Sequence, residues 1–139
     1  MRLHTGLLAF TGSLCMLLSL VLAWGLAGAR SSSRLKSWIA SPQYLLKAHL
    51  DFLMMTGLLF VFFLTSRQLG LEVPAVVVAA MCAGSVGNPL GFLALALKPD
   101  LPQRPASVFG AVMLMSFTAT TVGYGGAAWI VARAVLLER

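Results

Sequence analysis

The sequence predicts an all-α membrane protein, built as a bundle of four transmembrane helices. Of its 139 residues, 59% are hydrophobic and only 10% are charged, which leaves too little polar surface to cover a water-soluble globule of this size. Four apolar stretches also approach the roughly 20 residues that a helix needs to cross the hydrocarbon of a bilayer. These stretches are residues 6–29, 44–65, 74–97 and 108–132.

The connections between the stretches are short, so we expect residues 1–139 to form a single transmembrane domain. Four spans place both termini on one side of the membrane, together with four basic residues, and leave six basic residues on the other side. This excess favours a cytoplasmic position for the 30–43 and 98–107 loops. We expect a multi-pass protein of a bacterial inner membrane. Its net charge of +6 suits loops that meet anionic head groups, and no basic stripe with interleaved aromatics predicts nucleic-acid binding.

The first stretch, residues 6–29, follows Arg2 and ends in an Ala-Gly-Ala sequence, a combination also found in signal peptides. Its apolar run is longer than the core of a usual signal peptide, so we expect a retained helix. Cys15 and Cys82 fall in the middle of the first and third stretches. Two such positions make neither a disulfide framework nor a thiolate metal site, and we expect both to pack among apolar neighbours.

The second stretch opens with three ionisable residues, Lys47, His49 and Asp51. Ionisable groups inside a membrane are costly, which makes each a candidate functional residue. Imidazole is the commonest metal ligand and a frequent axial ligand of haem iron, so His49 is the candidate metal ligand. The alternative is that His49 only hydrogen-bonds a carbonyl of a neighbouring helix.

Helical periodicity places His49 on a stripe with aromatic and small residues. The stripe consists of His49, Phe52, Leu53, Thr56, Gly57 and Phe60. It offers a nitrogen ligand, aromatic walls and a gap that suits a flat ring, so Phe52 and Thr56 are candidate cofactor-binding residues. The alternative is that Thr56 and Gly57 merely let another helix approach closely.

Asp51 leaves the same helix about 200° away from His49. Lys47 lies one turn earlier, and an ion pair between the two side chains is the simplest expectation. The other interpretation makes Asp51 a catalytic carboxylate.

The third stretch contains an irregular segment, residues 84–92, with three glycines that leave room for close packing. Pro89 lacks an amide hydrogen and frees the carbonyl of Ser85, which predicts a kink or a cavity near the middle of the membrane. Asn88 must find a hydrogen-bond partner at this depth. An interhelical hydrogen bond and a polar contact to a bound molecule both stay open, and the second makes Asn88 a candidate catalytic residue.

The fourth stretch is rich in hydroxyl groups and glycines. These residues are Ser116, Thr118, Thr120, Thr121, Gly123, Tyr124, Gly125 and Gly126. Hydroxyls bonded to their own helix and glycines at a helix contact account for them without a ligand. The alternative for Tyr124 is a phenol that faces a pocket.

Motifs of soluble enzymes do not occur: there is no glycine-rich phosphate loop, nucleophile elbow or metal-spaced histidine pair. The chain has two histidines, His4 and His49. They belong to opposite ends of the membrane, about 30 Å apart, too far for both to bind one iron.

Three short motifs mark the predicted helices. They are Arg2-Leu3-His4-Thr5-Gly6, Lys47-Ala48-His49-Leu50-Asp51, and Asn88 followed by Gly91-Phe92. This layout resembles the small four-helix membrane proteins that include styrene oxide isomerase and the hydroxylaminobenzene mutases. The resemblance implies a b-type haem between the protomers of a homotrimer, with His49 as the axial ligand and an open ferric face for a substrate oxygen.

The match to this family differs between its branches. Asp51, two residues after the histidine, is similar to the H-L-E pattern of the mutases. Met55 stands where the family has an asparagine, and Leu93 stands where the isomerase has a tyrosine after the Gly-Phe pair. Because both polar groups are missing, the resemblance implies haem binding more strongly than epoxide isomerisation.

The leading hypothesis is a membrane protein that binds haem b. It is either an enzyme that rearranges a small apolar, oxygen-bearing aromatic without net redox change, through Lewis-acid activation, or a haem binder without this activity. The expected partners are the lipid bilayer, the apolar substrate and further copies of the chain in a trimer. The rival hypothesis is a haem-free small transporter or accessory subunit in which His49 and Asn88 only join helices.

Overall fold

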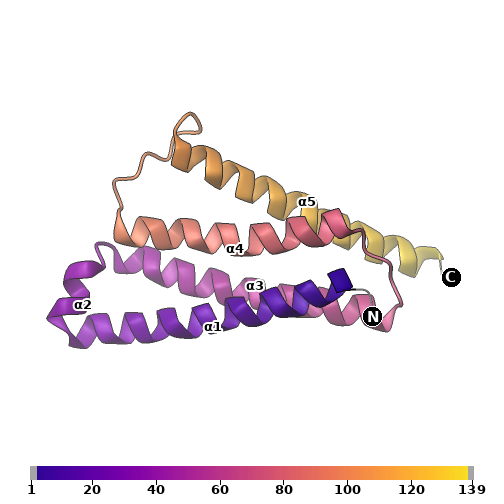
Figure 1. The fold of residues 1–139 in the computed structure, drawn as a ribbon, viewed down its shortest axis with the longest axis horizontal. Coiled ribbons are helices and arrows are strands. Elements are labelled where there is room, and N and C mark those ends of the chain that lie inside the picture. The colour runs from indigo at the N-terminus through magenta and orange to yellow at the C-terminus, as the bar shows by residue number, and fades with distance from the viewer. Residues whose placement is uncertain (1–2, 138–139) are drawn as a thin grey trace.

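The computed structural model describes residues 3–137 and confirms the all-α fold, with helices and no strands in that range. Four helices are long and apolar enough to cross a membrane. They are α1 (Leu3–Ser31), α3 (Pro42–Gln68), α4 (Ala75–Leu97) and α5 (Val108–Leu137). The first connection, expected as a loop, also contains the short helix α2 (Ser33–Trp38) (Figure 1).

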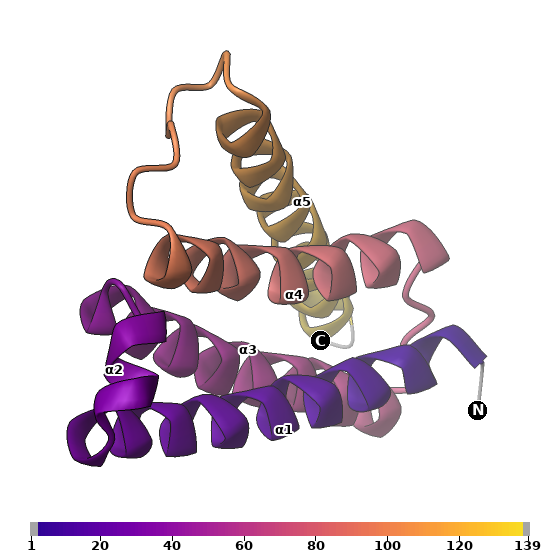
Figure 2. The same cartoon turned by 60° about the vertical axis from the view of Figure 1, so that its left-hand side comes forward.

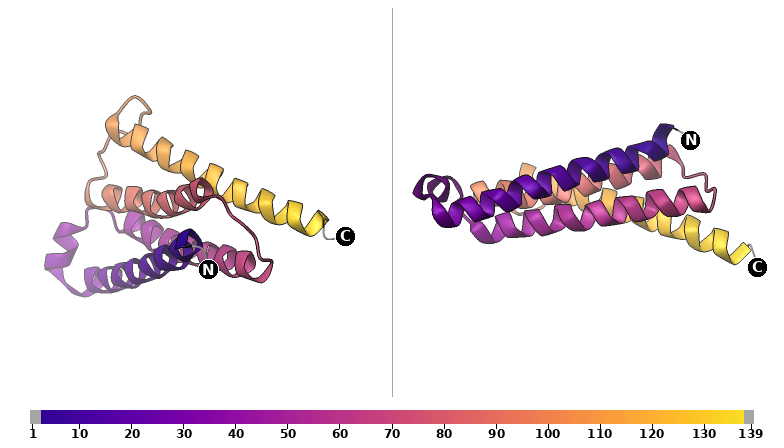
Figure 3. Two further views of the ribbon diagram at one scale, coloured as in Figure 1. Left: turned by 45° about the vertical axis from the view of Figure 1, so that its right-hand side comes forward. Right: turned by 90° about the horizontal axis from the view of Figure 1, so that it is seen from below.

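The long helices are arranged in layers. α1 and α3 run side by side in opposite directions, α4 lies across this pair, and α5 packs on the far side of α4 (Figure 2). Both ends of the described chain lie at one end of the bundle, opposite α2 (Figure 1). The last turns of α5 extend past the start of α4 (Figure 3). α5 is therefore attached to the bundle mainly through α4.

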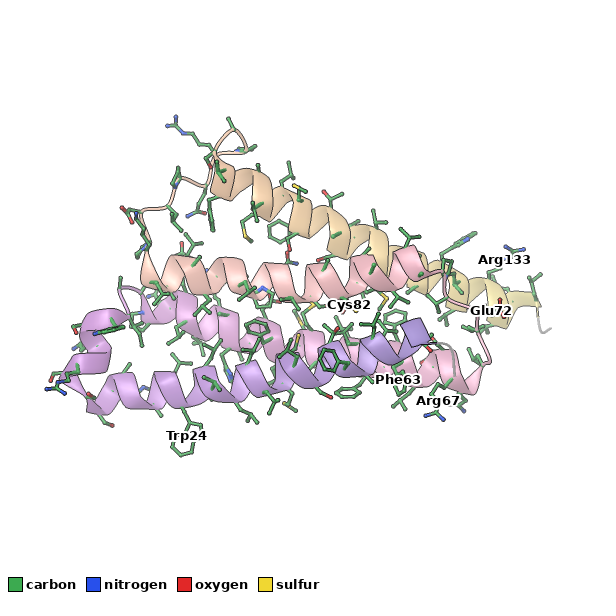
Figure 4. The ribbon with its side chains drawn as sticks, viewed as in Figure 1. Trp24, Phe63, Arg67, Glu72, Cys82 and Arg133 are labelled. Carbon is green, nitrogen blue, oxygen red and sulfur yellow. The ribbon has the colours of Figure 1, made fainter. Side chains whose placement is uncertain are left out.

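The core lies where α1, α3 and α4 meet. Its largest fully buried side chains include Leu8, Cys15, Phe52, Leu59, Val78 and Met81. Many other apolar side chains point outward, and Trp24, 79% exposed, projects away from α1 (Figure 4). An apolar outer surface is expected for helices that lipid surrounds, where packing and hydrogen bonds, rather than the hydrophobic effect, hold helices together.

Glycines bring the backbones of α4 and α5 into direct contact. A Cβ atom on Gly84 of α4 would lie 2.6 Å from the backbone nitrogen of Thr120, and one on Gly123 of α5 would overlap the backbone of Met81. Real Cβ atoms do not approach backbone atoms this closely. Each helix thus uses a glycine to admit the backbone of the other, as small residues do at membrane-helix contacts.

Pro89 does not interrupt α4, which is continuous from Ala75 to Leu97. The carbonyl oxygen of Ser85, which Pro89 leaves without its helical donor, accepts a hydrogen bond from the thiol of Cys15 at 3.8 Å. Cys15 is fully buried and is not in a disulfide. A weak donor on α1 therefore compensates the missing backbone amide, in addition to the packing role that we expected for this cysteine.

Candidate functional site

A reciprocal contact between His49 of α3 and Ser19 of α1 forms the centre of the candidate site. Nδ1 of His49 lies 2.9 Å from the backbone oxygen of Ser19 and 3.0 Å from its Oγ. The Ser19 hydroxyl donates to the backbone oxygen of His49 at 3.1 Å. Because Ser19 is buried, these bonds join the two helices inside the bundle.

These distances indicate which nitrogen of His49 carries the hydrogen. Without a hydrogen, the lone pair on Nδ1 would face the lone pairs of the Ser19 carbonyl oxygen at 2.9 Å, a repulsive arrangement. Nδ1 therefore donates to that oxygen, and in the neutral ring the free lone pair belongs to Nε2. Within residues 3–137, no hydrogen bond involves Nε2.

The surface next to His49 is apolar and partly open. His49 itself is half-buried, and further along α3 Leu53 and Gly57 are exposed. A Cβ atom on Gly57 would have no neighbour within 4 Å. We call the surface formed by His49, Leu53 and Gly57 the His49 ledge. It combines a half-buried imidazole with an apolar surface that has open space at Gly57.

Phe52 and Thr56 lie on the inner side of α3. Phe52 is fully buried in the core, and Thr56 is 4% exposed. The Thr56 hydroxyl donates to the backbone oxygens of Phe52, at 2.9 Å, and of Gly12 on α1, at 3.3 Å. The residues of the predicted stripe therefore do not all face the same way. Phe52 and Thr56 belong to the contact between α1 and α3, and their role as cofactor-binding residues stays a prediction.

Asp51 does not form the expected ion pair with Lys47. The Lys47 ammonium lies instead over the ring of Tyr44, with Nζ 5.1 Å from the ring centroid. Asp51 is half-buried. It lies on the same face of α3 as Ala48, three residues before it, and Met55, four residues after it, and both of these are buried. It leaves α3 on the opposite side from His49, so the two side chains of the chain do not meet in one pocket.

Asn88 joins α4 to α5 through both ends of its side-chain amide. Its Nδ2 donates to Oγ1 of Thr120 at 2.9 Å, and its Oδ1 accepts from the hydroxyl of Ser116 at 2.7 Å. The side chain is 4% exposed. In this structure Asn88 therefore makes interhelical hydrogen bonds, which was one of its two interpretations from the sequence. A contact between Asn88 and a bound molecule would require these bonds to be exchanged.

Tyr124 of α5 also uses its phenol within the bundle. Its hydroxyl lies 2.6 Å from Oγ of Ser85 on α4, and its ring is 5.7 Å from that of Phe62 on α3, centroid to centroid, tilted by 59°. Tyr124 thus connects three helices. It extends the polar α4–α5 contact one turn beyond Asn88 and Thr120.

An apolar pocket of about 280 Å³ opens between the end of α4 and the start of α5. Its lining includes Phe92, Phe109, Met113 and Phe117. Phe92 belongs to the Gly-Phe motif of the third stretch and lies one turn after Asn88. The pocket is large enough for a small aromatic molecule, but it lies at the α4–α5 contact, whereas His49 lies at the α1–α3 contact.

A bare metal ion lacks a ligand set in the described part of the chain, where no three His, Cys, Asp or Glu residues come together. A single protein nitrogen is nevertheless enough as an axial ligand of haem, because the porphyrin supplies all four equatorial ligands. Nε2 of His49 satisfies this requirement, and its Nδ1 hydrogen bond to a backbone carbonyl is the partner that metal-bound histidines usually have.

Ser19 was not among the residues that the sequence singled out. Its only signal is that it is a lone hydroxyl in the second half of an apolar stretch, which most often bonds back to its own helix. Pairing with His49 depends on how α1 and α3 are aligned. That alignment follows from the antiparallel arrangement and from the length of the connection between them.

Comparison with known proteins gives no match: no family model, curated protein sequence or solved structure corresponds to the chain. Fold and site therefore define its class directly. It is a small multi-pass α-helical membrane protein whose apolar helices are joined by polar contacts, among them His49 with Ser19 between α1 and α3 and Asn88 with Thr120 between α4 and α5.

Proposed function

We propose that the protein binds a b-type haem with Nε2 of His49 as its axial ligand. The observation that carries this proposal is the hydrogen bond from Nδ1 to the Ser19 carbonyl, since it holds the ring in place and leaves the lone pair on Nε2. The motifs around His49 that resemble the isomerase and mutase family also support it. Helical apolar spans suit a bacterial inner membrane as the location.

The residues around His49 fit a flat apolar cofactor. The His49 ledge has an exposed leucine and a glycine with open space above it, which is the kind of apolar surface against which a porphyrin can pack. One protomer supports only one face of such a ring. We therefore propose a homotrimer in which a neighbouring copy covers the other face, as the family resemblance also implies.

The proposed chemistry is a redox-neutral rearrangement of a small apolar, oxygen-bearing aromatic. When bound, ferric haem supplies a Lewis acid for the substrate oxygen. The chain contributes an apolar wall, made of Leu53 and the outer surface of α3, which excludes water from a developing cation. Asp51 and Asn88 are polar residues that belong to the second and third of the motifs, and we propose them as the catalytic side chains. Within one protomer neither meets His49, so a catalytic role for them requires the contribution of a neighbouring copy or a change in packing.

The test compares the optical spectrum of the purified protein with that of a variant in which His49 is replaced. We expect a Soret band at a fixed ratio of haem to chain, its loss in His49→Ala, and its retention in His4→Ala, which removes the other histidine. The cofactor is expected to be extractable into acidified organic solvent, because Cys15 and Cys82 are far apart in the sequence and do not form the C-x-x-C-H motif of covalent haem attachment. A full Soret band in His49→Ala would contradict the proposal.

A second candidate function is a haem-free accessory subunit or small transporter. It is favoured by the completeness of the polar contacts: Asn88 uses both ends of its amide, and His49 and Ser19 bond in both directions. In this case His49 holds α1 and α3 together and binds no iron. Protein that is isolated from haem-replete cells and takes up no haem on titration would support this candidate over the first.

A further inference from the structure

We propose that the corner between α1, α2 and α3 binds the phosphate group of an anionic phospholipid. A cleft of about 450 Å³ lies there, where the end of α1, the short helix α2 and the start of α3 meet. Its lining residues are Leu26, Ala29, Arg30, Lys36, Pro42, Gln43 and Leu46. Cations from two separate helices and an amide from a third thus border one cavity with an apolar floor.

Neither cation of this cleft has an acidic partner. No ion pair of Arg30 or Lys36 occurs within the described residues 3–137, and the lining of the cleft contains no acidic side chain. Two unneutralised cations at one cavity favour an anion with several acceptor oxygens.

The local backbone holds the cleft in shape. The backbone amide of Lys36 in α2 donates to the backbone oxygen of Ser32 at 3.1 Å. The amide of Ser32 in turn donates to the backbone oxygen of Gly28 in α1 at 2.8 Å. The amide of Ser41 donates to the oxygen of Ala96 at 2.9 Å, which fixes the start of α3 to the end of α4. The cations are therefore carried by segments that are bonded to the bundle.

The position of the cleft favours a lipid over a free anion. α1 ends at Ser31 and α3 begins at Pro42, so the cleft lies at the level of the head groups. Trp38, 80% exposed, is typical of side chains that anchor a helix there. Free phosphate would neutralise Arg30 and Lys36 but would leave the apolar floor uncovered, whereas the first carbons of an acyl chain cover it.

The experiment compares the binding of phosphatidylglycerol and phosphatidylcholine to delipidated full-length protein, measured by native mass spectrometry. We expect preferential binding of phosphatidylglycerol. The double variant Arg30→Gln/Lys36→Gln should reduce its affinity about 25-fold, since each basic side chain near a membrane surface contributes roughly fivefold. The matched control Lys98→Gln/Arg104→Gln makes the same change in net charge on the other loop and should retain the affinity. Arg30→Lys/Lys36→Arg keeps the charges and should also retain it.

Three outcomes would overturn the proposal. Equal binding of the two lipids removes the role of the anionic charge. Equal losses in the double variant and in its matched control show attraction to general surface charge and no site. Displacement of phosphatidylglycerol by millimolar inorganic phosphate identifies a simple anion site in which the apolar floor has no part. None of these outcomes depends on haem, so the result is separable from that of the proposed function.

Discussion

Ser19 and His49 exchange hydrogen bonds in both directions across the contact between α1 and α3. The imidazole of His49 donates to the Ser19 backbone oxygen at 2.9 Å, and the Ser19 hydroxyl donates to the His49 backbone oxygen at 3.1 Å. Backbone oxygens inside helices normally accept only from their own helix. Here each accepts a second bond from the other helix, so this pair fixes both the ring of His49 and the relative alignment of the two helices.

The first prediction concerns this alignment. Ser19→Ala should lower the free energy of unfolding by about 1 kcal/mol, the usual size of an interhelical hydrogen bond in a membrane. Ser13→Ala is the matched control, because the exposed Ser13 hydroxyl bonds only to Ala9 of its own helix, and it should have little effect. Denaturant titration in mixed micelles measures both. Equal effects of the two variants would show that the bond between Ser19 and His49 does not contribute to stability.

The second prediction concerns Asn88. Asn88→Leu keeps a similar volume but removes the two hydrogen bonds to Ser116 and Thr120, so we expect a loss of about 1–2 kcal/mol of stability and a looser attachment of α5. Thr121→Ala is the control, because the exposed Thr121 bonds only to Phe117 of α5. The yield of a disulfide engineered between α4 and α5 reports the attachment. An unchanged yield in Asn88→Leu would contradict this prediction.

The third prediction uses two glycines of α5. Gly123→Ala should destabilise the protein by about 1–3 kcal/mol, because its Cβ would meet the backbone of Met81, which has little freedom to move. Gly125→Ala should be neutral or stabilising by about 0.5–1 kcal/mol, because nothing lies within 4 Å of its Cβ and alanine favours the helix. Thermal unfolding in detergent compares them. The critical result is that Gly123→Ala is less stable than Gly125→Ala. If Gly125→Ala were the less stable variant, α4 and α5 would not pack through Gly123.

The fourth prediction concerns substrate choice and rests on the proposed haem site. We expect little turnover of styrene oxide, because Met55 and Leu93 provide no hydrogen bond at the positions where the resembling family has polar groups, and Met55 is buried. An N-arylhydroxylamine is the better candidate, since Asp51 matches the mutase pattern. Product analysis after incubation with both compounds decides between them. Rapid formation of phenylacetaldehyde that His49→Ala abolishes would show that the two polar groups are dispensable.

The four long helices were predictable because length and hydropathy are sufficient to identify a span. The short helix α2 was not, since its six residues combine serines and cations without an apolar period. The ion pair between Lys47 and Asp51 was a wrong expectation for a similar reason. The spacing of the two residues along the helix allowed this ion pair, but the flexible Lys47 side chain lies over the ring of Tyr44 instead. Helical spacing alone does not show which of the two neighbours the side chain contacts.

The candidate site was predictable only in part. His49 and Asn88 could be named as polar residues that need partners, because an unsatisfied group in hydrocarbon is expensive. Which partners they have depends on the contacts between helices, and these depend on alignment. From the sequence, a helix-joining role for Asn88 therefore stayed open beside a ligand-binding one, and Ser19 could not be identified as a partner.

The attachment of α5 through α4 affects how the chain is built into a bilayer. Helices enter the membrane in the order of their synthesis, so α1 and α3 can pair, and α4 can join them, before α5 exists. During this interval the amide of Asn88 lacks Ser116 and Thr120, its partners in the finished protein, and Gly84 presents an uncovered groove. Assembly of the third span is therefore complete only when translation of the fourth has ended.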